Sequence, residues 1–105
     1  MRVGNVVEVA GTTAQDGDVV SGNDAYTQTK RILEKIDAAL REAGAALTDV
    51  VRTRIYVTDI SQWESVGRAH GEIFKDIRPA SSIVEVRALI DARLLVEIEA
   101  TAIIS

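Results

Sequence analysis

The segments Arg78-Pro-Ala-Ser-Ser-Ile-Val-Glu-Val-Arg87 and Leu94-Leu-Val-Glu-Ile-Glu-Ala100 decide the fold of this chain. The first segment contains the only proline of the sequence, directly before a run of residues typical of a β-strand. The second is another strand-like run, and it carries Glu97 and Glu99 on one side because side chains alternate between the two faces of a strand. Together they predict two consecutive strands at the end of the domain.

Upstream of these segments, the pattern alternates between strands and helices. Asn5–Ala10 is a short valine-rich run that ends at Gly11, which predicts a first strand. Asp16-Gly17 is a tight-turn signal, after which Val19-Val20 is expected to return as the partner strand. Apolar residues at spacings of three and four then predict a helix from Asp24 to about Ala43.

The second half of the chain repeats this alternation. Residues 51–57 alternate as a strand does, and Ser61 with Glu64 matches a capping box that opens a helix over 61–74. Strands near 82–86 and 94–103 complete the order ββαβαββ. We therefore expect one α+β domain over residues 1–105, with one mixed sheet and two helices on one face.

The faces of the predicted strands suggest assembly. The face under the helices should be filled by Val51, Ile55, Val57, Val84, Val86, Val96, Ile98 and Ala100. The opposite face should then show Arg52, Arg54, Tyr56, Ile83, Glu85, Arg87, Glu97 and Glu99. This second set is apolar in part and balanced in charge, so we interpret it as a subunit interface.

Composition excludes several classes of function. The 105 residues include 12 Lys and Arg against 16 Asp and Glu, for a net charge of −4, which disfavours nucleic acid or an anionic membrane as a partner. The chain has no cysteine and one histidine, so we expect no metal site and no thiolate chemistry. No signal segment or membrane-length apolar run is present, and we expect a cytoplasmic protein.

Few residues remain as candidates for chemistry. His70 can act as a general base, although its helix position favours packing. Trp63 can stack on a ligand, but the start of a helix favours a role as a core anchor. The pair Arg52 and Arg54 can clamp a carboxylate, and we favour instead cross-strand pairing with the two glutamates at 97 and 99.

Glu97 and Glu99 are the most interesting carboxylates. Near an oligomer seam, one of them can be desolvated and hold a water molecule. The alternative is a salt bridge to an arginine of the neighbouring strand, which the sequence alone slightly favours.

At this point the residues match a known family. The chain resembles the RidA family (YjgF, or reactive-intermediate deaminases), whose members were often described as L-PSP endoribonucleases. The likeness covers nearly the whole chain and is carried by these segments: Val3-Gly-Asn5, Val9-Ala-Gly11, Asp49-Val-Val-Arg-Thr53, Tyr56-Val-Thr-Asp59, Pro79-Ala80, Val84-Glu-Val86 and Val96-Glu-Ile-Glu-Ala100.

The resemblance implies a chorismate-mutase-like α+β fold, assembled as a homotrimer with ligand clefts between subunits. It also implies hydrolysis of reactive enamines and imines to carbonyl compounds and ammonia, without a metal or an organic cofactor. By position, Glu97 would orient the attacking water, and Gly11 and the backbone amide of Ile83 would line the pocket. The segment Ser81-Ser82-Ile83 would bind an oxygen of the ligand.

Two features depart from the family pattern. The arginine that holds the substrate carboxylate is replaced by Ser81, and a hydroxyl gives one neutral hydrogen bond where guanidinium gives a charged fork. That loss should cost about 1.5–3 kcal/mol of binding energy. Arg78 offers a substitute cation from an extended stretch. A Gly-Pro-Tyr motif, expected upstream of the first strand, is not in the sequence.

Three hypotheses follow. The first is a divergent RidA-like hydrolase of an imine, an enamine or a related small carbonyl compound. The second is a trimeric small-molecule-binding protein without catalysis. Ribonuclease activity ranks last, because the chain is acidic and has no basic patch with interleaved aromatic residues.

Overall fold

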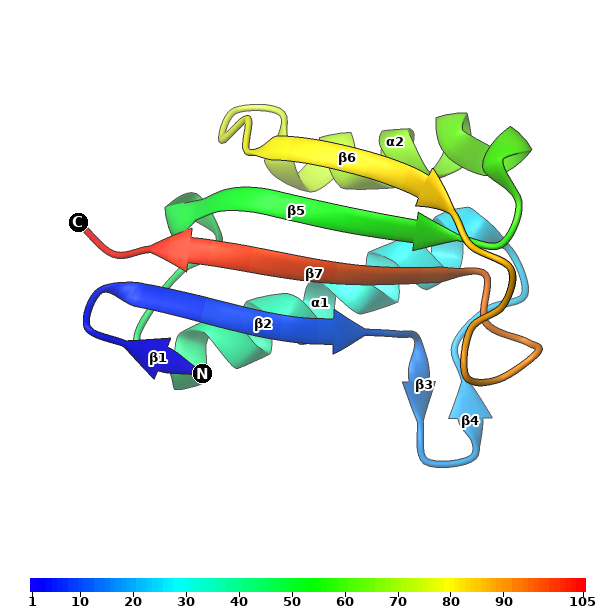
Figure 1. Cartoon of the computed structure of the whole chain (residues 1–105), viewed down its shortest axis with the longest axis horizontal. Coiled ribbons are helices and arrows are strands. Elements are labelled where there is room, and N and C mark those ends of the chain that lie inside the picture. Colours follow the sequence, from blue (N-terminus) through cyan, green and yellow to red (C-terminus); the bar gives the residue numbers. More distant parts are fainter.

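Five strands form one mixed sheet, with the two helices packed behind it (Figure 1). The computed structural model describes all residues from Met1 to Ser105. The strand order is β1-β2-β7-β5-β6, and only β5 and β6 run parallel. These strands are β1 (Arg2–Val3), β2 (Val6–Thr12), β5 (Val50–Val57), β6 (Ala80–Glu85) and β7 (Val96–Ile103). The predicted α+β class, with a mixed sheet and helices on one face, is confirmed.

The helices are α1 (Ala25–Glu42) and α2 (Trp63–Phe74), and α1 begins where the sequence predicts. Asp24 caps it by accepting a hydrogen bond from the Thr27 amide at 3.0 Å. Apolar residues of α1 at helical spacing are buried against β2 and β7, while α2 packs beside α1. Neither helix is long and apolar enough to cross a membrane.

The first predicted hairpin is wrong in its pairing. Val19-Val20 (β4) pairs with Gln15–Asp16 (β3) in a separate two-stranded ribbon, not with β2. Figure 1 shows this ribbon projecting from the end of β2. Asp16-Gly17 does form the turn, with Gly17 at φ 63°. The strands that it joins, β3 and β4, have only two residues each and pair with each other alone.

The predicted capping box at the start of α2 is also wrong. A 3-10 turn, η2 (Ile60–Gln62), precedes the helix. Its cap is Asp59, whose carboxylate accepts hydrogen bonds from the Ser61 amide at 3.0 Å and the Ser61 hydroxyl at 2.7 Å. Ser61 and Glu64 do not cap each other, because neither side chain accepts a hydrogen bond from the other's amide, and Glu64 lies in the first turn of α2.

One predicted face of β5 needs correction. The pairing of β5 with β7 shifts register between Val50 and Arg52. Val50 therefore takes the buried position, and Val51 is 43% exposed rather than part of the core.

The alternation of β6 is shifted by one residue from the prediction. Parallel pairing places Ser81 beside Thr53 and Ile83 beside Ile55, and both partners on β5 are buried under the helices. Ile83 consequently faces α2, and Val84 is 48% exposed on the other side. A strand with adjacent apolar residues on both faces does not specify its register by pattern alone.

The corrected faces define two surfaces used below. The helix-covered face of the sheet carries the core. The open face, which no helix covers, carries alternate residues of the strands: Arg54 and Tyr56 of β5, Ser82 and Val84 of β6, and Glu97 and Glu99 of β7. Glu85, predicted on the open face, belongs with Ile83 on the other.

Candidate functional site

Glu97 lies on the open face of β7, directly beside Gly11 of β2. A Cβ atom at position 11 would stand 2.5 Å from Oε2 of Glu97, so only glycine leaves room for this carboxylate. Glu97 is half-buried and takes part in none of the five ion pairs of the chain. The carboxylate therefore has free acceptor capacity at a partly desolvated position, which is what holding a water molecule requires.

A bulge in β2 creates this approach. The register of β2 against β7 shifts between Val9, which pairs with Ala100, and Thr12, which pairs with Ile98. The extra residue bends the strand and leaves Gly11 next to Glu97. The structure thus brings together two of the predicted site residues, Gly11 and Glu97.

The second glutamate of the pair is engaged. Tyr56 donates its hydroxyl hydrogen to Oε1 of Glu99 at 2.7 Å. This hydrogen bond, together with partial burial and the negative charge of Glu99, raises the pKa of Tyr56 above its usual value of 10.0. Glu97 and Glu99 therefore differ, because one oxygen of Glu99 already accepts a hydrogen bond from Tyr56, whereas the Glu97 carboxylate accepts none within the chain.

The cross-strand ion pairs favoured from the sequence do not form. Arg52 donates from Nη2 to the Ser82 hydroxyl at 2.9 Å, and Arg54 donates from Nη2 to the Thr101 hydroxyl at 3.5 Å. The register places Glu99 directly opposite Arg54, yet each guanidinium group contacts a hydroxyl group at a diagonal position, and Glu99 accepts instead from Tyr56.

A second group of polar residues lies on the helix-covered face. The Ser81 and Thr53 hydroxyl oxygens are 2.6 Å apart, and the Thr53 hydroxyl oxygen lies 2.9 Å from Nε2 of His70. Thr53 is fully buried, and His70 packs its ring against Phe74 with the centroids 4.7 Å apart. Burial lowers the pKa of His70 below its usual 6.5, so the imidazole is neutral at pH 7. The predicted packing of His70 at the inner edge of α2 is confirmed.

Ser81 and His70, but not the buried Thr53, line a cavity of about 180 Å³ between α2 and β6, which we call the Trp63 cavity. Trp63, Val66 and His70 line it from α2, and Ser81 and Ile83 line it from β6. Trp63 is 55% exposed, so its predicted role as a core anchor is wrong. Because a 3-10 turn occupies Ile60–Gln62, α2 begins at Trp63 rather than at Ser61, and the indole lines the cavity.

The predicted site residues thus fall into two groups. Gly11 and Glu97 lie on the open face, whereas Ser81 and Ile83 border the Trp63 cavity on the helix-covered face. Ser82 also lines the cavity, and its hydroxyl oxygen accepts a hydrogen bond from Arg52. The two groups do not share a pocket within one chain.

Arg78 does not substitute for the missing cation. Its backbone is in the left-handed region at φ 55°, and its side chain turns back to the end of α2, where Nε donates to the Lys75 carbonyl at 3.4 Å. The guanidinium therefore does not enter the Trp63 cavity, whose lining does not include it.

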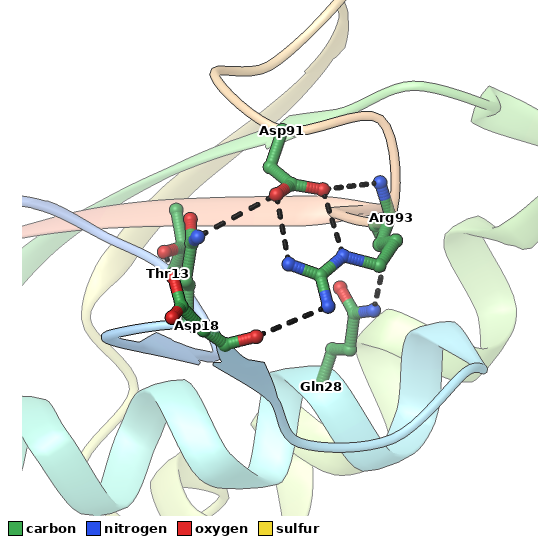
Figure 2. Close-up of polar contacts among 6 residues, drawn as sticks. Thr13, Asp18, Gln28, Asp91 and Arg93 are labelled. Carbon is green, nitrogen blue, oxygen red and sulfur yellow. Dashed lines mark hydrogen bonds and ion pairs between the residues drawn. The ribbon is translucent and has the colours of Figure 1, made fainter.

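Sequence reasoning missed a polar brace that holds the loop before β7. Gln28 of α1 is fully buried; its Nε2 donates to the Arg93 carbonyl at 2.9 Å, and its Oε1 accepts from the Leu95 amide at 2.8 Å. Figure 2 shows this amide beneath the loop. The brace fixes the chain two residues before Glu97, and no local pattern signals it because the contacts span more than 60 positions.

The other part of the brace is an ion pair within the loop. Arg93 donates from Nη2 to Oδ2 of Asp91 at 2.9 Å and from Nη1 to the Asp18 carbonyl at 3.2 Å (Figure 2). The hydrogen bonds from Arg93 hold the pKa of Asp91 at about 2. These contacts tie the loop to the β3–β4 ribbon.

Two larger hollows, of about 300 and 570 Å³, lie near Asn23 and Leu95 and contain none of the predicted site residues. No group of three or more His, Asp or Glu side chains is placed to hold a metal ion.

Fold and site together define a small α+β protein with a free carboxylate on an open sheet face and an apolar cavity at the sheet edge. The family model described as Endoribonuclease L-PSP matches residues 1–104. The chain therefore belongs to the L-PSP family, the YjgF/RidA family that the sequence resembles.

Three relatives agree with this family assignment. It is 54% identical to Rv2704, a YjgF-family member from Mycobacterium tuberculosis, whose crystal structure matches with a TM-score of 0.91 over 98% of this chain and 82% of that one. It is 40% identical to a RutC family protein of Pyrococcus abyssi over 97% of this chain and 81% of the relative. It is 34% identical to the 3-aminoacrylate deaminase RutC of Acinetobacter baylyi over 96% of this chain and 81% of the relative.

Proposed function

We propose that the chain is a RidA-like hydrolase of a small imine, an enamine or a related carbonyl compound, acting in clefts between the subunits of a homotrimer. The observation that carries this proposal is the free, half-buried carboxylate of Glu97 beside Gly11. The relative described as a 3-aminoacrylate deaminase supports the reaction class, because 3-aminoacrylate is an enamine.

The division of the site supports an intersubunit location. Glu97 faces the open side of the sheet, and Ser81 and Ile83 face the other side at its edge. A small ligand cannot reach both groups in one subunit. A symmetric assembly that packs the β6 edge of one subunit against the open face of the next would bring the groups together.

The edge position of β6 supplies free donors. Because β6 is the last strand of the sheet, half of its backbone amides have no strand partner. The Val86 amide donates to the Val57 carbonyl of β5, so alternation directs the Ile83 amide to the free edge. That amide can hold an oxygen or nitrogen of the ligand at the cleft.

The chemistry follows from a positioned base. The Glu97 carboxylate accepts a proton from a water molecule, whose oxygen forms a bond to the carbon of the C=N group while the π electrons move to nitrogen. The protonated Glu97 then returns this proton to the nitrogen, which gives a carbinolamine. Transfer of the hydroxyl proton to the amino group lets ammonia leave as the carbonyl forms. An enamine first becomes an imine by gaining a proton from water at its terminal carbon and losing a proton from its nitrogen to water. These steps require no oxidant, reductant or further reactant.

A trimeric binding protein without catalysis is the second candidate. The observation that favours it is the position expected to hold an arginine, where the Ser81 hydroxyl lies 2.6 Å from the Thr53 hydroxyl and offers no positive charge. Saturable binding of small carbonyl compounds without any turnover would identify this function.

The test is ammonia release from freshly generated 2-aminoacrylate and, in parallel, from an uncharged imine. We expect release above the spontaneous rate for at least one of them. Replacing Glu97 by Gln should lower the rate by about 10²–10⁴-fold, the usual contribution of a general base. Glu99→Gln is the matched control, because Glu99 lies on the same face of β7 and already accepts a hydrogen bond from Tyr56. An equal loss of rate in both variants, or no loss of rate in Glu97→Gln, would exclude Glu97 as the general base.

A further inference from the structure

The Trp63 cavity is free of formal charge. The residues that line it are Ile55, Trp63, Val66, Gly67, His70, Ser81, Ser82 and Ile83, and none of them is acidic, Lys or Arg. Its one titratable side chain, His70, is kept neutral because burial lowers its pKa. A carboxylate that entered would lose its hydration without meeting a cation, whereas an uncharged group of the same shape would lose far less.

The cavity has one polar wall. Ser81, Thr53 and His70 form a hydrogen-bonded chain, with 2.6 Å between the hydroxyl oxygens and 2.9 Å to Nε2. Each hydroxyl has one proton, so the direction of the chain depends on whether Nε2 accepts or donates. In one direction the Ser81 hydroxyl donates to Thr53, and in the other it accepts from Thr53 and its proton is directed at the Pro79 carbonyl oxygen 3.4 Å away. In both cases the Ser81 oxygen retains a lone pair for a ligand. A primary amide matches this site, because its NH2 group can donate to the Ser81 oxygen.

The cavity also has an aromatic surface. Trp63 lines the cavity and is 55% exposed, an unusual exposure for the largest apolar side chain of a small domain. Its ring provides a flat surface on which a planar group can stack.

We propose that the Trp63 cavity binds a small, uncharged, planar molecule that stacks on Trp63 and hydrogen-bonds to the Ser81 hydroxyl. This inference rests on the proposed function, since Ser81 and Ile83 belong to the same candidate site, and it narrows the ligand class to molecules without a carboxylate.

The chain reports on this cavity directly, because Trp63 is its only tryptophan. The experiment is a fluorescence titration of the full chain with benzamide and with benzoate, which share size and shape but differ in charge. We expect a saturable change with benzamide and binding of benzoate weaker by about tenfold or more. Equal binding of the two, or no change with either, would overturn the proposal.

Two substitutions sharpen the test. Ser81→Ala should weaken benzamide binding by roughly 3- to 10-fold, the value of one neutral hydrogen bond. Ser81→Arg should reverse the preference toward benzoate by introducing a cation. Ser65→Ala, on α2 but outside the cavity, is the control and should bind as the wild type does. An unchanged preference in Ser81→Arg, with the fold verified by circular dichroism, would also contradict the proposal.

The binding and turnover measurements separate the two proposals. A benzamide preference without ammonia release from any substrate would exclude the hydrolase and leave this inference intact. Ammonia release without any preference for benzamide over benzoate would support the hydrolase and exclude the proposed uncharged ligand.

Discussion

At the residue scale, the contact between Glu97 and Gly11 carries most of the functional argument. The carboxylate occupies the space that a side chain at position 11 would fill. Family resemblance identified both residues from the sequence, and the bulge in β2 explains why they meet. Resemblance did not reveal that Glu99 is bound by Tyr56, because a cross-strand hydrogen bond depends on a register that the sequence does not specify.

Gly11→Ala should lower the activity of the protein without unfolding it. The new Cβ would stand 2.5 Å from the end of a flexible side chain rather than from backbone, so Glu97 should move and the fold should persist. We expect ammonia release to fall by about 10- to 100-fold, as for a catalytic group displaced by an ångström. Activity assays and thermal unfolding check this outcome.

The control for this substitution is Gly71→Ala, where a Cβ meets nothing within 4 Å on α2. It should retain full activity and gain up to about 1 kcal/mol of stability from helix propensity. Wild-type activity in Gly11→Ala would show that the carboxylate position is not critical.

At the element scale, α1, β5 and the mixed sheet were predictable because their patterns are long and periodic. The β3–β4 ribbon, the start of α2 and the register of β6 were not. Each of these depends on a short segment, and contacts from elsewhere in the chain decide its structure. The β6 register matters most for function, because it moves Ile83 from the predicted interface to the Trp63 cavity.

The brace under the loop before β7 predicts a large effect of Gln28→Leu. The substitution leaves the Arg93 carbonyl and the Leu95 amide without their buried partners. We expect a loss of about 2–4 kcal/mol in the free energy of unfolding, measured by urea titration. Gln62→Leu, at an exposed glutamine, is the control and should change stability little. A similar result for both variants would show that the brace is unimportant.

Asp91 should make the loop sensitive to acid. Its folded-state pKa of about 2 lies below the usual 3.8, so its stabilising contribution is complete above pH 3.8 and is lost as the pH falls toward 2. The difference in urea midpoint between wild type and Asp91→Asn should therefore shrink between about pH 4 and pH 2. The exposed Asp76→Asn variant is the control, since Asp76 takes part in no ion pair. A constant difference across this range would contradict the role of the Asp91–Arg93 pair.

At the scale of the whole molecule, the open face of the sheet stands out because it exposes apolar side chains that no helix covers. It exposes Val84 and Ile103 beside half-buried arginines, a tyrosine and glutamates. The sequence predicted a subunit interface here, and this remains a prediction. A native mass three times the 11.3 kDa of the chain is expected from sedimentation, and a monomer would exclude any site shared between subunits.

The central claim is that Glu97 of one subunit and Ser81 and Ile83 of another complete a single site. The most direct measurement is complementation between Glu97→Gln and Ser81→Trp, which obstructs the Trp63 cavity. The two variants are unfolded together, refolded as a mixture and assayed for ammonia release. We expect each variant alone to be inactive and the mixture to recover roughly a quarter of the wild-type rate, the share of randomly assembled interfaces with both halves intact. A mixture that forms trimers and is no more active than its components would contradict the claim.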